Sequence, residues 1–149
     1  MGAHVLGAPL APAARERYGQ GLLELFEGDY RAVNDFLLRS VDRLTDKSVG
    51  LMQADSVFAG IAVFLTANKA YATLASGALV ILLAAVGLCC SNLISTSSRL
   101  GGKLRPEAIL AHGVKIMMDR TVRFTLALYL TGAAFALIIL QVLLQALRP

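Results

Sequence analysis

Two uncharged runs, each long enough to cross a bilayer, limit what this chain can fold into. Residues 70–94 contain no charged residue in 25 positions, and residues 124–147 contain none in 24. A helix rises by about 1.5 Å per residue, so about 20 apolar residues cross the ~30 Å hydrocarbon layer. Arg123 and Arg148 bracket the second run and can reach the lipid headgroups from either end. Both runs are predicted to be transmembrane helices.

A third, weaker span is predicted from residue 51 to residue 69. Asp55 interrupts it, and thirteen uncharged residues separate Asp55 from Lys69. An apolar run of this length also fits a buried hairpin segment. We favour a span, because Met52 extends the run at one end and the Lys69 amine can reach the headgroups at the other. The predicted fold class is an all-α, small polytopic membrane protein with N-terminal amphipathic helices and three transmembrane helices, at about 51–69, 72–94 and 124–147.

Residues 1–28 are predicted to form an arm ahead of a membrane domain that covers residues 29–149. In this arm Leu22, Leu23 and Phe26 follow a polar first turn. That pattern favours a short helix that lies on the membrane surface or binds a partner. Gly28 should end this helix, and Asp29 can cap the next one by accepting a hydrogen bond from a free backbone N–H. The second helix carries a narrow apolar stripe and is expected to continue into the first span.

The segment 95–123 is predicted to be a basic loop that contains a helix. Pro106 fits the first turn of that helix, and Glu107 beside it favours the positive end of the helix dipole. The helix is expected to run into the last span without a break.

The distribution of basic residues predicts the orientation of the chain. The segments 1–50 and 95–123 together hold twelve of the fourteen Lys and Arg residues. Basic segments stay on the cytoplasmic side, so we expect an integral protein of a bacterial inner membrane with its N-terminus in the cytoplasm. Because the basic residues flank apolar spans, lipid phosphates are the expected partners rather than nucleic acid. The predicted headgroup contacts are Arg99, Lys103, Arg105 and Lys115.

Asp55 lies at membrane depth, where a carboxylate is costly unless it is paired, protonated or close to the interface. We expect an ion pair with Arg123, or failing that with Arg120, because both arginines begin the third span from the same side. An arginine fork can also hold a carboxylate through two hydrogen bonds. An exposed interfacial carboxylate and a proton-linked or ligand-linked role are the alternatives.

Other polar and small residues in the spans predict contacts between helices. Gln141 and Gln145 lie four positions apart near the far end of the third span and are expected to make interhelical polar contacts. Small residues in every span allow helices to approach closely, either inside one bundle or between subunits. They are Ala59, Gly60, Ala62, Ala72, Ser76, Gly77, Gly132, Ala133 and Ala136.

No motif in the sequence predicts catalysis. There is no Gly-rich phosphate loop, no nucleophile elbow and no cluster of carboxylates. The adjacent Cys89 and Cys90 lack the spacing of metal ligands. We therefore expect no enzyme activity, no cofactor and no metal site.

Two features carry a resemblance to a known family. Ala54-Asp55-Ser56 stands at the start of the first span, and the basic stretch 115–120 precedes the last span. In this layout residues 31–147 resemble the transmembrane effectors of Pycsar-type cyclic-nucleotide antiphage systems, in which a cytoplasmic helix leads into a first span with an Ala-Asp-x-Lys-Ala-like start. The resemblance implies an oligomerising protein that impairs membrane integrity.

The soluble segments are short and contain no recognisable receptor domain. This favours an accessory or structural subunit of a larger inner-membrane complex, which binds partners through its arm and its small-residue helix faces. An oligomeric, membrane-disrupting effector and a small channel or transport component are the alternatives. The expected partners are the lipid bilayer and either other membrane subunits or further copies of the chain.

Overall fold

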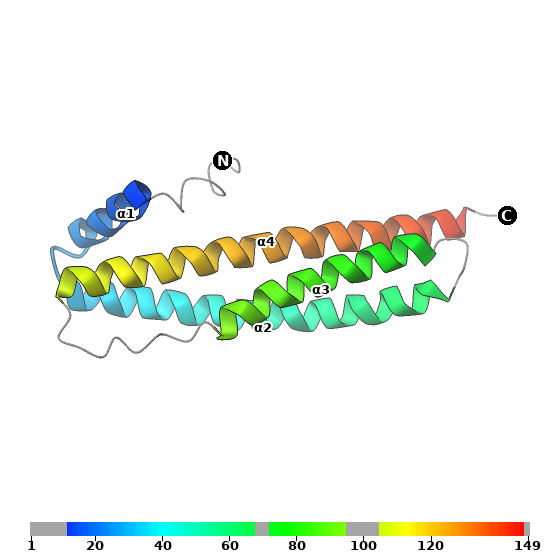
Figure 1. Cartoon of the computed structure of the whole chain (residues 1–149), viewed down its shortest axis with the longest axis horizontal. Coiled ribbons are helices and arrows are strands. Elements are labelled where there is room, and N and C mark those ends of the chain that lie inside the picture. The colour runs from blue at the N-terminus through cyan, green and yellow to red at the C-terminus, as the bar shows by residue number, and fades with distance from the viewer. Residues whose placement is uncertain (1–11, 68–71, 95–104, 148–149) are drawn as a thin grey trace. The chain divides into compact units, whose positions relative to one another are not determined.

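The computed structural model describes residues 12–67, 72–94 and 105–147, which form four helices and no strand (Figure 1). The helices are α1 (Pro12–Leu25), α2 (Tyr30–Thr66), α3 (Ala72–Ile94) and α4 (Pro106–Ala146). Three of them, α2, α3 and α4, are long and apolar enough to cross a membrane. The predicted all-α fold with three spans is confirmed, and the chain is an integral membrane protein. The last two residues of the predicted first span, 68 and 69, lie outside the described residues.

The chain divides into two units. Unit 1 comprises Met1–Asp46 and Ser95–Arg123, and unit 2 comprises Lys47–Ile94 and Phe124–Pro149. Unit 2 therefore contains the three apolar segments, whereas α1 shares unit 1 with the first parts of α2 and α4. The apolar side chains of α1 pack inside unit 1, and the predicted boundary at residue 28 stays a prediction.

The junction between α1 and α2 follows from local chemistry. Gly28 has φ +81°, a conformation that glycine adopts without a Cβ clash, and its N–H donates to the Leu23 carbonyl at 2.7 Å. Asp29 Oδ1 then accepts hydrogen bonds from the N–H groups of Arg31 at 2.8 Å and Ala32 at 3.2 Å. These bonds satisfy donors that have no partner inside a helix. The predicted break at Gly28 and cap at Asp29 are confirmed.

The predicted start of the last helix is also confirmed. Pro106 is the first residue of α4, where its missing N–H removes no helical hydrogen bond. The carbonyl of Arg105 accepts from Ala108 N at 2.9 Å and from Ile109 N at 3.2 Å, which closes the first turn. From Pro106 the helix continues to Ala146 without a break, as the sequence predicts.

The core of unit 1 explains where the apolar side of α1 goes. Leu22 is only 6% exposed and belongs to a buried cluster with Val33 and Leu37 of α2 and Val114 of α4. Leu23 and Phe26, each half-buried, pack against the same cluster. These three residues of the predicted arm therefore lie against the chain's own helices, and binding of a partner through the arm stays a prediction.

The core of unit 2 is built mainly from alanine. One buried cluster contains Ala62, Ala75, Ala78 and Ala134 together with larger residues, and a second contains Ala85, Cys89 and Ala127. Small side chains at these positions allow helices to approach closely in lipid, where apolar side chains gain little by leaving the solvent. On α3 the buried positions alternate in steps of three and four residues, a spacing typical of left-handed helix bundles. They are Ala75, Ala78, Leu82, Ala85, Cys89 and Asn92.

In both units α2 and α4 meet at a nearly constant sequence offset. Three side-chain hydrogen bonds join residues separated by 75, 76 and 76 positions. Gly113 and Leu37, which are also 76 positions apart, lie in close contact, because a Cβ added at Gly113 would lie 3.1 Å from Leu37 Cδ1. Because both residue numbers rise together, α2 and α4 run parallel. The pairs are Leu37 with Gly113 and Thr45 with Arg120 in unit 1, and Asp55 with Thr131 and Leu65 with Gln141 in unit 2.

Candidate functional site

Asp55 lies inside unit 2, where its side chain is 0% exposed. Thr131 Oγ1 of α4 and Asp55 Oδ1 form a hydrogen bond of 2.7 Å, and Oδ2 has no hydrogen-bond partner among the described residues. The partner of Asp55 is thus Thr131, rather than the predicted Arg123 or Arg120. This buried carboxyl group is the candidate functional site of the protein.

The offset between α2 and α4 explains why the predicted pairing is wrong. Asp55 plus 76 positions gives Thr131, whereas Arg123 precedes Thr131 by eight residues, about 12 Å along a helix. The prediction paired Asp55 with Arg123 because both lie near the start of a span. Distance from the start of a span does not give the register of one helix against another. A signal for Thr131 does exist in the sequence. It is one of a few polar residues in the last span, and it lies three and seven positions before the buried Ala134 and Ile138.

Arg120 and Arg123 belong to unit 1. Arg120 is buried, and its Nη1 donates to Thr45 Oγ1 of α2 at 3.2 Å. Arg123 and Asp42 are charged neighbours of Arg120. In unit 1 this arginine therefore joins α4 to α2 through a hydroxyl group.

A second buried polar contact joins α3 to α2. Asn92 Nδ2 lies 3.4 Å from Ser48 Oγ, and both side chains are buried. Asn92 was not among the polar contacts predicted from the sequence. The signal is the spacing, because Asn92 continues the buried series of α3 three positions after Cys89.

Gln141 makes the predicted interhelical polar contact. Its Nε2 donates to the backbone carbonyl of Leu65 at 3.1 Å, and its side chain is fully buried. Because α2 ends at Thr66, Leu65 carries one of the last four carbonyls, which have no partner inside the helix. Gln141 therefore caps α2 from a neighbouring helix. Gln145 differs, since its buried Nε2 has no hydrogen-bond partner among the described residues.

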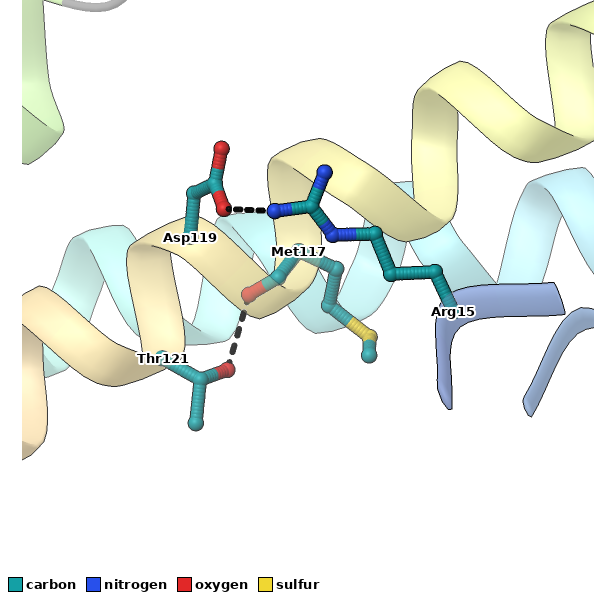
Figure 2. A network of polar contacts seen from close by, with 4 residues as sticks. All are labelled: Arg15, Met117, Asp119 and Thr121. Atoms are coloured by element: carbon teal, nitrogen blue, oxygen red, sulfur yellow. Dashed lines mark hydrogen bonds and ion pairs between the residues drawn. The ribbon is translucent and has the colours of Figure 1, made fainter. Parts of the chain in front are cut away.

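Unit 1 holds a cavity of about 470 Å³ between α1 and α4, a size typical of small-ligand pockets. Its floor is apolar, with Leu23 and Val114, and its rim carries charges of both signs. Close by, Arg15 of α1 pairs with Asp119 of α4 at 3.2 Å, and Figure 2 shows the two side chains pointing toward each other. Both side chains are about one-quarter exposed, so the ion pair contributes little to stability, and its main effect is to orient α1 on α4.

The predicted headgroup contacts are only partly described. Arg105 and Lys115 are exposed, and Lys115 stands at the rim of the unit 1 cavity. Arg99 and Lys103 lie outside the described residues. Contact of these four side chains with lipid phosphates remains a prediction.

Across residues 12–67, 72–94 and 105–147, no group of three or more His, Cys, Asp or Glu side chains is placed to hold a metal ion. Cys89 is buried and Cys90 half-buried, and both are free thiols. In these residues several buried polar side chains of unit 2 form hydrogen bonds between helices. Such groups join helices and, at Asp55, offer a place for a proton.

No family model, no curated protein and no solved structure matches this chain.

Proposed function

We propose that this protein is a noncatalytic subunit of a larger complex in a bacterial inner membrane. In this proposal its N-terminus lies in the cytoplasm, and its spans bind other membrane helices through outward-facing small residues. The orientation is supported by the twelve Lys and Arg residues in the segments 1–50 and 95–123.

One observation carries the proposal: several small residues of the spans point away from the chain's own bundle. Ala62 is buried, as are the core alanines of α3 and α4. Five of the small residues predicted from the sequence to support helix contacts are exposed instead. They are Gly60 on α2, Ser76 on α3, and Gly132, Ala133 and Ala136 on α4.

Glycine at such a position needs a reason, because it is about 0.8–1.0 kcal/mol less favourable than alanine in a helix interior. Beyond its sequence neighbours and the nearby backbone of its own helix, a Cβ added at Gly60 or at Gly132 would meet no heavy atom of the described residues within 4 Å. The chain's own packing therefore does not require glycine there. In membranes, small outward-facing residues let the backbone of a second helix approach closely. This supports a contact with another membrane helix on α2 and on α4.

The exposed small residues, and not the arm, carry the partner-binding role in this proposal. In the arm, Leu22 is buried inside unit 1, and Leu23 and Phe26 are half-buried against the same cluster. On the outward faces of the spans large apolar residues stand beside the small ones, for example Phe64 on α2 and Leu143 on α4. A surface of this kind suits lipid as well as protein.

The test is purification from native membranes at native expression level, followed by native-gel sizing. We expect the wild-type chain to migrate in fixed ratio with other membrane subunits, and Gly132→Leu to lose that association. The control is Val142→Leu, which changes another exposed position of α4 without adding bulk at a small residue.

Three outcomes separate the candidate functions. Association with a larger complex that is lost in Gly132→Leu supports the role of a subunit. A complex made of this chain alone supports the Pycsar-type effector, in which the same faces bind further copies, and membrane leakage on cyclic-nucleotide addition would then be expected. A monomer that purifies alone contradicts both, and ion flux through it in vesicles would favour a channel or transport component.

A further inference from the structure

The surroundings of Asp55 offer its carboxyl group little that stabilises a negative charge. Among the described residues of unit 2 the charged side chains are Asp55 and Lys47, and Lys47 is exposed eight positions earlier on α2. From α3 the titratable group that faces Asp55 is the thiol of Cys89, and α4 contributes the hydroxyl of Thr131. An ionised carboxylate in such a place has lost its water and gained one neutral donor.

The hydrogen bonds of Thr131 indicate where a proton sits. The Thr131 hydroxyl has one hydrogen, but two acceptors lie within reach: Asp55 Oδ1 at 2.7 Å and the carbonyl of Ala127 at 3.0 Å. If Asp55 is ionised, these two acceptors compete for that one hydrogen. If Asp55 carries a proton on Oδ1, the acid donates to Thr131 Oγ1 and Thr131 donates onward to Ala127, so each hydrogen has its own acceptor.

Oδ2 leads to the same conclusion. It is buried and has no hydrogen-bond partner among the described residues. A lone pair of a neutral C=O group that is left without a donor costs far less than a buried carboxylate with a single hydrogen-bond donor.

We propose that the Asp55 carboxyl group is a proton-binding site inside the membrane unit, which holds a proton at neutral pH and donates it in a hydrogen bond to Thr131. The ligand is a proton and not a metal cation, because the carboxyl and hydroxyl oxygens of Asp55 and Thr131 fall short of the six or more oxygens that hard cations such as Ca²⁺ prefer. Loss of the proton places a charge between α2 and α4. The packing of these two helices is therefore linked to proton occupancy at Asp55.

Infrared spectroscopy of the full chain in lipid vesicles tests this site directly. A protonated carboxyl group has a C=O stretching band that an ionised carboxylate lacks. In protein labelled with ¹³C at the aspartate side-chain carboxyl, that band moves to lower frequency and is thereby assigned to Asp. We expect one such band at pH 7, its loss in Asp55→Asn, and its retention in Asp46→Asn, which removes an exposed acid of unit 1.

Thr131→Val is the second variant, and it keeps the acid. Because valine has the shape of threonine without the hydroxyl, the acid band of Asp55 should remain and shift to higher frequency as its hydrogen bond is lost. The absence of any labelled acid band at pH 7 in the wild-type chain would overturn the proposal. This holds even if Asp55→Asn fails to fold. A band that persists unchanged in both Asp55→Asn and Thr131→Val would overturn it as well, because the proton would then belong to another aspartate.

Discussion

Replacement of Gln141 by leucine should destabilise the protein, whereas the same replacement at Gln145 should not. Gln141 donates to the Leu65 carbonyl at 3.1 Å in the last turn of α2, so Gln141→Leu leaves that buried carbonyl without its donor. An unsatisfied buried group costs about 1–3 kcal/mol, and single interhelical hydrogen bonds in membranes average about 0.6 and reach about 1.7 kcal/mol. Gln141 Oε1 is also buried and has no hydrogen-bond partner among the described residues, so its removal offsets part of the loss. We therefore expect a net loss of about 1 kcal/mol.

Gln145→Leu is the matched control, one helical turn further along α4. Its buried Nε2 has no partner among the described residues, so leucine removes an unsatisfied donor and leaves no acceptor orphaned. We expect a change between zero and a small gain in the free energy of unfolding.

Thermal unfolding in detergent, followed by circular dichroism, measures both variants. A loss of 1 kcal/mol should lower the Tm by about 2–4 °C for a chain of this size. Hydrogen exchange adds a local readout, because Gln141→Leu should speed exchange in the last turn of α2 and Gln145→Leu should not. Equal shifts in the two variants would refute the capping role of Gln141.

Three further outcomes are expected. Leu22→Ala should lower the free energy of unfolding by about 2–4 kcal/mol and expose α1 to proteolysis. Leu25→Ala, at a side chain 73% exposed, should change that free energy by no more than about 0.5 kcal/mol. A larger effect at Leu25 would show that α1 binds lipid instead. Asp29→Ala should cost about 1 kcal/mol through loss of the α2 cap, measured as faster exchange of the first amides of α2. Gly113→Ala should not give the gain of about 1 kcal/mol in stability that this replacement usually gives inside a helix, because its Cβ would lie 3.1 Å from Leu37 Cδ1. In a double-mutant cycle, adding Leu37→Val should restore that gain.

The parts of the fold that follow from local chemistry could be predicted from the sequence. The α3 bounds, Ala72–Ile94, coincide with the predicted span 72–94, because hydropathy over 20 residues depends on no distant contact. Gly28, Asp29 and Pro106 mark helix ends, since their backbone and capping properties act within a few residues. The continuity of α2 and α4 follows likewise from the absence of proline in the interior of either helix.

The contacts between helices could be predicted only in part. Periodicity gives the buried face of a helix but not its register against a partner 76 residues away, which is why Asp55 was assigned to Arg123 and not to Thr131. The small residues show the same limit. Their presence predicts that helices approach closely but not which small residues make the contact. Ala62 faces inward, whereas Gly60, two positions earlier on the same helix, faces outward.

The parallel pairing of α2 and α4 has a consequence for how the protein is made. Each hydrogen bond between them in unit 2 joins residues 76 positions apart, so α2 leaves the ribosome long before its partner exists. At synthesis rates of about 5–20 residues per second, 76 residues take roughly 4–15 s. During that interval Asp55 and the Leu65 carbonyl lack the α4 groups that later bond to them. The first span is thus a candidate for shelter by the insertion machinery until the last span arrives.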